Sequence, residues 1–230
     1  MGLFLIVGFF MVVSMLVGMR LKNRFNAYTK ISLKSGLTGR EVAERMLRDN
    51  GINDVQVTCV QGTLTDHYNP ANKTVNLSPE VYNGASVSAA AVAAHECGHA
   101  VQHATAYPFL QFRSAMVPLV NVSNQVINFI FLASIFGGLM FNFYDSNTML
   151  LIIIVAQGAI TLFSLVTLPV EFDATHRGLM WLNSTGLTYG EEHEKASHAL
   201  RLAATTYVVA ALSSLSVLLY YIMIFLGRRD

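Results

Sequence analysis

The sequence predicts an integral membrane protein that is mainly α-helical, with about four transmembrane helices and a small α+β part. Three observations predict this class. Hydrophobic residues make up 53% of the 230 residues and charged residues only 13%, about half the usual share of charge. Four stretches are apolar over about the 20 residues that a helix needs to cross a bilayer. A His-Glu-x-x-His run lies outside them, on a segment whose composition favours a helix.

The four apolar stretches are separated by two polar segments and one short loop. They cover residues 2–19, 116–141, 148–168 (ending at Pro169) and 203–226. A secretory signal is the alternative interpretation of the first stretch, but it has neither a basic start nor a small-residue cleavage site. We therefore expect an uncleaved anchor there. The second stretch begins with polar side chains that we expect to face other helices, because unpaired polar groups are costly in hydrocarbon: Asn121, Ser123, Asn124, Gln125 and Asn128.

Lysine and arginine are distributed unevenly between the two faces of this arrangement. Ten lie between the first and second stretches and three between the third and fourth, whereas the loop at 142–147 has none and only Arg228 and Arg229 oppose the trend. The positive-inside rule then predicts a multi-pass protein of the cell membrane with both polar segments in the cytoplasm. The predicted parts are an anchor (1–19), a cytoplasmic segment (20–114), a transmembrane hairpin (115–169), a second cytoplasmic segment (170–202) and a C-terminal transmembrane helix (203–230).

The first polar segment predicts a small α+β structure. A helix is expected at 38–51, with Thr38 and Glu41 as a capping box. Alternating patterns predict strands at 55–59 and 73–77, and an Ala-rich run predicts a helix at about 86–106. The two cysteines, Cys59 and Cys97, provide neither a disulfide framework nor a cysteine-based zinc site. No basic stripe interleaved with aromatic residues predicts binding of nucleic acid.

The candidate metal site lies on that last helix. His95 and His99 are four residues apart and therefore share one face, and two neutral imidazoles at this spacing suit one Zn²⁺ per chain. Glu96 lies beside the first histidine, where it can act as the general base. His103 continues the face but lies about 12 Å from His95 along the axis, too far to share the ion. Cys97 points away from this face and is expected to pack in the core.

A catalytic zinc site needs a third protein ligand. We expect Glu171, just after Pro169, with Asp173 orienting a ligand histidine and His176 contacting a developing oxyanion. His176 is the competing third ligand. The simpler alternative is that Glu171, Asp173 and Arg177 form only an ion-pair cluster at the membrane interface.

Several runs of the sequence resemble the neutral zinc metallopeptidase family often called YugP-like, and the resemblance covers nearly the whole chain. They are Leu64–Pro70, Lys73–Ser78, Ala93–His103, Leu168–Ala174 and Thr206–Ser214. More distantly, the chain is similar to HtpX-type membrane proteases and CAAX prenyl endopeptidases. The resemblance implies a membrane-bound, gluzincin-like zinc metallopeptidase with His95, His99 and Glu171 as ligands and Glu96 as base. The distant relatives place their aspartate further on than Asp173.

The predicted function is zinc-dependent hydrolysis of peptide bonds in proteins at or near the membrane. An extended substrate could pair with an open edge of the strand at 73–77. Tyr207 is an oxyanion candidate, and Asp66, His67 and Tyr68 are further candidates near the site. The oligomeric state stays open. The alternatives are a non-catalytic scaffold or assembly factor with a structural zinc, a transporter or channel, and an intramembrane protease, which the short motif helix disfavours.

Overall fold

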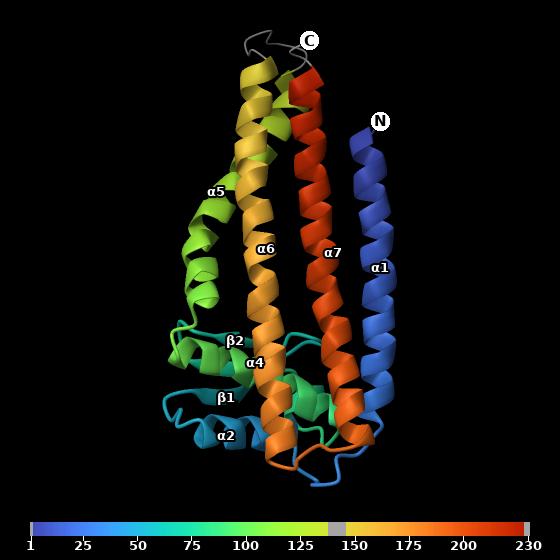
Figure 1. Cartoon of the computed structure of the whole chain (residues 1–230), viewed down its shortest axis with the longest axis vertical. Coiled ribbons are helices and arrows are strands. Elements are labelled where there is room, and N and C mark those ends of the chain that lie inside the picture. The colour runs from blue at the N-terminus through green and yellow to red at the C-terminus, as the bar shows by residue number, and fades with distance from the viewer. Residues whose placement is uncertain (1, 138–145, 228–230) are drawn as a thin grey trace. The chain divides into compact units, whose positions relative to one another are not determined.

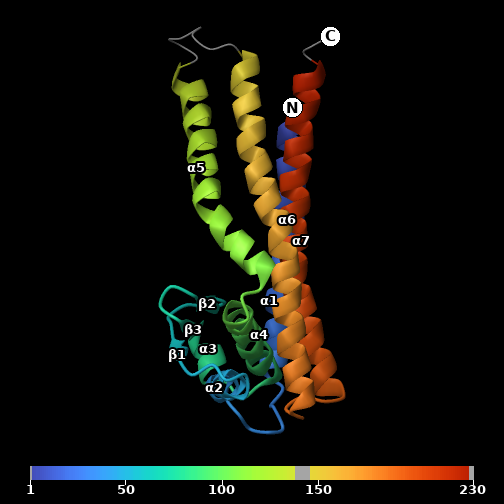
Figure 2. The same ribbon diagram turned by 60° about the vertical axis from the view of Figure 1, so that its left-hand side comes forward.

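The structure is a computed structural model that describes residues 2–137 and 146–227. Residues 142–145 of the predicted loop at 142–147, the end of the predicted second span, and Arg228 and Arg229 lie outside the described residues. Four helices are long and apolar enough to cross a membrane by length and composition: α1 (Gly2–Thr29), α5 (Pro108–Gly137), α6 (Ser146–Ser184) and α7 (Glu191–Gly227). With a three-stranded sheet, whose strands are labelled in Figure 2, these helices (Figure 1) confirm the predicted fold class.

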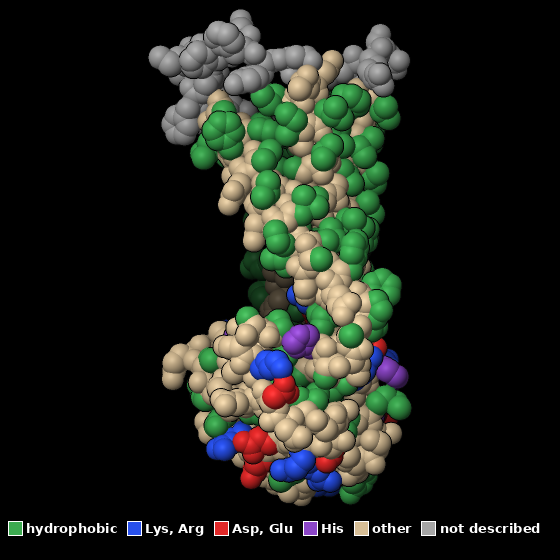
Figure 3. All heavy atoms as spheres, turned by 90° about the vertical axis from the view of Figure 1, so that its left-hand side faces the viewer, with side chains coloured by type: hydrophobic (Ala, Val, Ile, Leu, Met, Phe, Trp, Pro, Cys, Tyr) green, Lys and Arg blue, Asp and Glu red, His purple; other side chains and the backbone are tan. Residues whose placement is uncertain are grey.

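The chain divides into two compact units. The helical unit comprises residues 1–15, 112–168 and 207–230, and the mixed unit comprises residues 16–111 and 169–206. In the face that Figure 3 shows, hydrophobic side chains dominate the surface of the helices, and charged side chains gather over the mixed unit. Each unit has the surface that its composition predicts.

Polar contacts inside the helical unit join α6 to α7. The Gln157 amide donates to the Ser214 backbone carbonyl and hydroxyl at 3.2 and 3.1 Å, and Thr161 lies 2.8 Å from the same hydroxyl. The polar start of the second span behaves differently from expectation. Ser123 is buried, but its four amide neighbours are exposed rather than packed against other described helices: Asn121, Asn124, Gln125 and Asn128.

The sheet of the mixed unit has the order β1-β3-β2. Strand β1 (Gln56–Cys59) pairs in parallel with β3 (Thr74–Leu77), and β2 (His67–Asn69) pairs antiparallel with the other side of β3. The prediction that the strand at 73–77 offers an open edge is therefore wrong. β3 is central because β2, which the sequence reasoning did not identify, covers its other side, and β2 forms an edge.

Short helices begin at the predicted caps. Helix α2 (Gly39–Asp49) has the expected capping box, in which the Thr38 side chain accepts from the Glu41 backbone and Glu41 accepts from the Thr38 backbone. Helix α3 (Pro79–Tyr82) begins with proline at its first position. The Ser78 side chain does not cap it, because its hydroxyl contacts Asp66 instead, at 3.1 Å.

Helix α4 (Val87–Ala104) forms the centre of the mixed unit, and the Ser86 side chain caps it by accepting from the Ala89 backbone. The alanines of its first half are fully buried. One face contacts β2 and β3, and another packs closely against the 169–184 part of α6. A Cβ atom at Gly98 would lie 2.4 Å from the Ala174 carbonyl oxygen, and one at Gly178 would lie 2.9 Å from the Ala94 backbone. Glycine at both positions therefore allows the two helix backbones to touch.

Helix α6 does not end at Pro169. It continues to Ser184 with Pro169 in its interior, so the prediction of a helix end there is wrong. Proline removes one i→i−4 hydrogen bond at a cost of about 3 kcal/mol, but neighbouring groups in membrane proteins compensate for such losses. The residues from Glu171 to Arg177 are consequently helical, and their side chains follow the helical period.

Candidate metal centre

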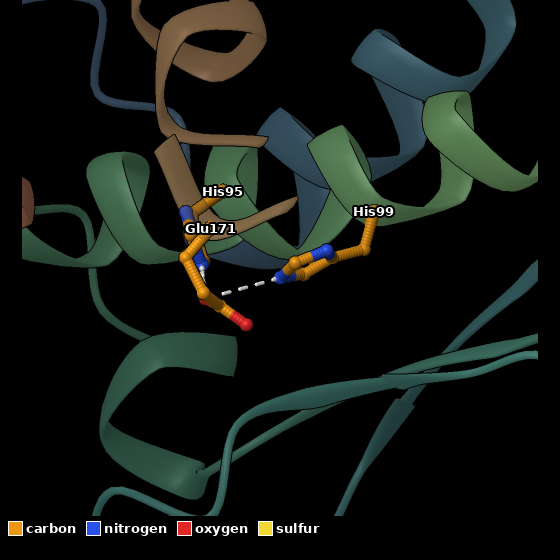
Figure 4. A group of neighbouring side chains, drawn as sticks. All are labelled: His95, His99 and Glu171. Atoms are coloured by element: carbon orange, nitrogen blue, oxygen red, sulfur yellow. Dashed lines mark ion pairs between the residues drawn. The ribbon is translucent and has the colours of Figure 1, made fainter. Parts of the chain in front are cut away.

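Three side chains from two helices converge in the mixed unit. His95 and His99 extend from α4 and Glu171 extends from α6, as Figure 4 shows. Glu171 Oε2 lies 3.4 Å from His95 Nε2 and 3.6 Å from His99 Nε2. All three side chains are largely enclosed, with 15%, 12% and 3% of the His95, His99 and Glu171 side chains exposed. Each side chain offers one possible metal-ligand atom, and the three atoms lie within 4.8 Å of one another. In the described part of the chain, these residues form the candidate metal-binding group.

These separations fit ligands that share one metal ion. Tetrahedral Zn²⁺ with bonds of about 2.0–2.1 Å places its ligand atoms about 3.3 Å from one another. The observed 3.4 and 3.6 Å are close to that value and longer than an ordinary N–H···O hydrogen bond of about 2.7–3.2 Å. Two imidazoles and a carboxylate are also the ligand set of many catalytic zinc sites. The residues present therefore fit zinc.

The electrostatic environment of His99 favours positive charge. Burial by itself lowers the pKa of His99, but the nearby Glu171 and Glu96 carboxylates outweigh burial and raise that pKa above its ordinary value. A divalent cation would supply the positive charge that these carboxylates favour. The site is thus electrostatically suited to a metal as well as geometrically suited to one.

The far nitrogen of each histidine ring also has a neighbour. His95 Nδ1 lies 3.2 Å from the hydroxyl of Thr175, one turn after Glu171 on α6. His99 Nδ1 lies 3.0 Å from Oε1 of Gln102, one turn further along α4. Both rings are therefore held with Nε2 toward Glu171. Neither Gln102 nor Thr175 was among the predicted site residues, although the position of Gln102, three residues after His99, was a usable signal.

Glu96 is close to the edge of the sheet. It is 8% exposed, and its Oε2 accepts a 3.0 Å hydrogen bond from the backbone N–H of Tyr68 in β2. Since this N–H points away from β3, the outer edge of β2 faces the Glu96 carboxylate. The Tyr68 hydroxyl lies 2.8 Å from His103 Nδ1, so His103 contacts the strand and is not part of the metal group.

Asp173 and His176 are not members of the metal group that the described residues form. His176 is exposed, because five residues of helix rotate it by about 140° from Glu171. Asp173 accepts hydrogen bonds from Gln102 at 2.8 Å and Arg177 at 2.6 Å, and reaches His99 through Gln102. Tyr207 belongs to the helical unit, and its oxyanion role stays a prediction. Cys97 is buried against the Ala43 carbonyl, and burial raises the pKa of its thiol.

Two of the candidates before the metal helix have structural contacts. Asp66 accepts from the backbone N–H of Ser78 at 2.7 Å, and burial raises the pKa of Asp66 above its ordinary value. His67 lies between the Thr65 carbonyl, 2.7 Å from Nδ1, and the Asn76 amide, 3.2 Å from Nε2. Both residues connect β2 to its neighbours.

The membrane-spanning helices and the metal group are those expected of a membrane metalloprotein, and comparison with known proteins identifies the family. The chain belongs to the family described as "Putative neutral zinc metallopeptidase", whose profile matches residues 3–226. It is 43% identical to "Putative membrane protease YugP" of Bacillus subtilis (strain 168) over 211 residues, which are 92% of this chain and 91% of that protein. No solved structure matches the chain.

Proposed function

We propose that the protein is a membrane-bound zinc metalloendopeptidase that hydrolyses peptide bonds of proteins at or near the membrane. The observation that carries this proposal is the convergence of His95, His99 and Glu171 at the separations of ligands to one zinc ion. The family and the membrane-protease relative support the same reaction class.

His95 Nε2, His99 Nε2 and a Glu171 carboxylate oxygen would hold the ion, one per chain. When bound, zinc lowers the pKa of a coordinated water and polarises the scissile carbonyl. Glu171 is fixed by its helix and almost fully enclosed, so it serves as a ligand rather than as a proton carrier.

Glu96 acts as the general base and then as the general acid. Its Oε2 is held by the Tyr68 N–H, and Oε1 takes a proton from the attacking water. The water oxygen bonds to the carbonyl carbon, the C–N bond breaks, and Glu96 returns the proton to the leaving amine. A carboxylate fixed at one oxygen keeps the other aimed at the reacting water, which reduces the entropy lost in the transition state.

The edge strand β2 receives the substrate. An extended peptide can add to an exposed sheet edge through backbone hydrogen bonds, and side-chain pockets then provide only loose sequence selectivity. The outer edge of β2 faces Glu96, which already accepts from the Tyr68 N–H, so a substrate would pair with the remaining backbone groups of this edge. A substrate strand bound along this edge would place its scissile bond beside the general base, Glu96.

The protein works as a multi-pass protein of the cell membrane, with residues 20–114 and 170–202 on the cytoplasmic face. Glu171 follows the apolar stretch at 148–168 by three residues, which favours substrates cut near the membrane surface. The partners are the lipid bilayer and a protein or peptide substrate.

The test of the metal centre is elemental analysis of detergent-purified protein after expression in zinc-replete medium. We expect near-stoichiometric zinc in the wild type and in His176→Ala, and loss of most zinc in Glu171→Ala. The reverse pattern would make His176 the third ligand. Zinc-free wild type, prepared without chelators, would contradict the proposal.

A further inference from the structure

Gln102 is a polar side chain at the centre of the contact between α4 and α6. It is fully buried, with 0% of its surface exposed. Its Nε2 donates to the Val170 carbonyl at 2.7 Å and to Asp173 Oδ2 at 2.8 Å, and its Oε1 lies 3.0 Å from His99 Nδ1. Burying an amide without partners is costly, and here both of its ends have them.

Only one orientation of this amide is chemically acceptable. The Val170 carbonyl and the Asp173 carboxylate are both acceptors, so the group that faces them must be the NH₂ of Gln102. A rotated amide would place its oxygen against two other acceptors. Oε1 is therefore directed at His99, and as Oε1 can only accept, His99 Nδ1 must carry the proton.

We propose that Gln102 is a positioning residue that holds His99 in its metal-binding tautomer. A neutral imidazole protonated on Nδ1 presents an unprotonated Nε2, and that atom faces Glu171 at 3.6 Å. This inference rests on the proposed zinc site and adds a residue to it. Asp173 was predicted to orient a ligand histidine directly. In the structure it instead orients the Gln102 amide, which orients His99.

The far end of this chain of contacts is anchored. Arg177 donates to Asp173 at 2.6 Å from one turn along α6, and its guanidinium lies 5.7 Å from the centre of the Tyr107 ring. Asp173 and Arg177 thus supply a fixed acceptor for the Gln102 amide. The other histidine ligand, His95, has a Thr175 hydroxyl as the partner of its Nδ1. Because a hydroxyl can either donate or accept, this partner is compatible with both tautomers of His95.

The test combines two measurements on detergent-purified full-length protein. The first is zinc affinity, measured by competition with a chromophoric chelator. The second is the tautomer of neutral His99 in zinc-free protein, measured by ¹⁵N NMR after histidine labelling at alkaline pH, where the imidazole ring is uncharged. The test variant is Gln102→Leu, which keeps approximate volume and removes every hydrogen bond. The control is Val101→Ala. Val101 is a buried neighbour on the same helix, so this variant loses packing but keeps the hydrogen bonds of Gln102.

We expect Gln102→Leu to bind zinc roughly 10- to 100-fold more weakly than the wild type, the usual effect of removing a partner of a metal-ligating histidine. Its zinc-free His99 should no longer be protonated predominantly on Nδ1. Val101→Ala should lose thermal stability but keep zinc affinity within about threefold and keep the tautomer.

The outcomes separate this inference from the proposed function. If the wild type binds zinc and Gln102→Leu binds it equally well with an unchanged tautomer, only the positioning role is refuted. The same holds if Val101→Ala loses as much affinity as Gln102→Leu. If the wild type binds no zinc, the metal site fails, and the NMR measurement alone then decides whether Gln102 sets the His99 tautomer.

Discussion

At the scale of single residues, the two carboxylates of the site have different surroundings. Glu171 approaches two imidazole nitrogens at 3.4 and 3.6 Å, whereas Glu96 accepts a backbone N–H from the sheet at 3.0 Å. A carboxylate among nitrogen ligands suits metal binding. One that is held by a single hydrogen bond and adjoins the ligand set suits proton transfer.

The hydrogen bond from Tyr68 to Glu96 can be removed without disturbing the sheet. Because the Tyr68 N–H points away from β3, proline at this position removes the bond and keeps the ladder. We expect Tyr68→Pro to lower kcat about tenfold relative to Tyr68→Ala, with zinc content unchanged. Tyr68→Ala is the matched control, since it also loses the contact with His103. Equal kcat in the two variants would show that this bond does not position the base.

The metal ligands and the general base could be predicted from the chemistry of single residues, but the residue that positions His99 could not. His95, Glu96 and His99 were predicted from helical spacing, and Glu171 from the cost of an acidic group beside an apolar stretch. Gln102 was missed because its spacing from His99 shows only that the two side chains share a helix face, and its other partners, Val170 and Asp173, lie about 70 residues away in sequence.

At the scale of elements, the close contact of α4 with α6 determines the position of the third ligand. Gly98 and Gly178 lie against the partner helix backbone, and Glu171 reaches the histidines because the two backbones touch. Glycine inside a helix costs about 1 kcal/mol relative to alanine. That cost is offset because glycine allows the backbones of α4 and α6 to come into contact.

Gly98→Ala should therefore weaken the metal site although it touches no ligand atom. The new Cβ would lie 2.4 Å from the Ala174 carbonyl oxygen, and overpacking of this kind costs about 1–3 kcal/mol. We expect a lower unfolding temperature in detergent and a zinc affinity reduced at least tenfold, measured by chelator competition. Gly158→Ala is the control, because nothing lies within 4 Å of a Cβ there. Unchanged zinc affinity in Gly98→Ala would contradict the role of this contact.

Elements with strong local signals were predicted well, and those governed by tertiary context were not. The α2 capping box is present as predicted, as are helices and strands close to the predicted ranges. Strand β2 was missed because three residues are too few to show a period. The continuation of α6 past Pro169 was missed because proline usually marks a helix end in local sequence.

At the scale of the whole molecule, the metal ligands come from distant parts of the chain. His95 and His99 belong to residues 16–111 of the mixed unit, and Glu171 belongs to residues 169–206. A shared ion would connect these two segments and stabilise the folded state, since a ligand that binds only the folded state adds about 2.7 kcal/mol at 100 times its Kd.

Chelation should accordingly lower the thermal stability of the wild type. We expect the unfolding temperature in detergent to fall by several degrees on addition of a chelator, and to recover with added zinc. Glu171→Ala should start lower and respond weakly to either treatment. An equal response of the wild type and Glu171→Ala would indicate that zinc acts elsewhere on the molecule.

The most direct test of the central claim is a paired measurement of zinc content and peptide-bond hydrolysis in Glu96→Gln. The probe is fluorescently labelled casein, an unfolded protein with accessible peptide bonds. The preparations are detergent-purified wild type and variant with zinc bound. Glutamine keeps the shape of Glu96 but cannot take a proton, so the account predicts full zinc content and a rate at least 1,000-fold below that of the wild type. Zinc-loaded Glu96→Gln that cleaves at the wild-type rate would contradict the account.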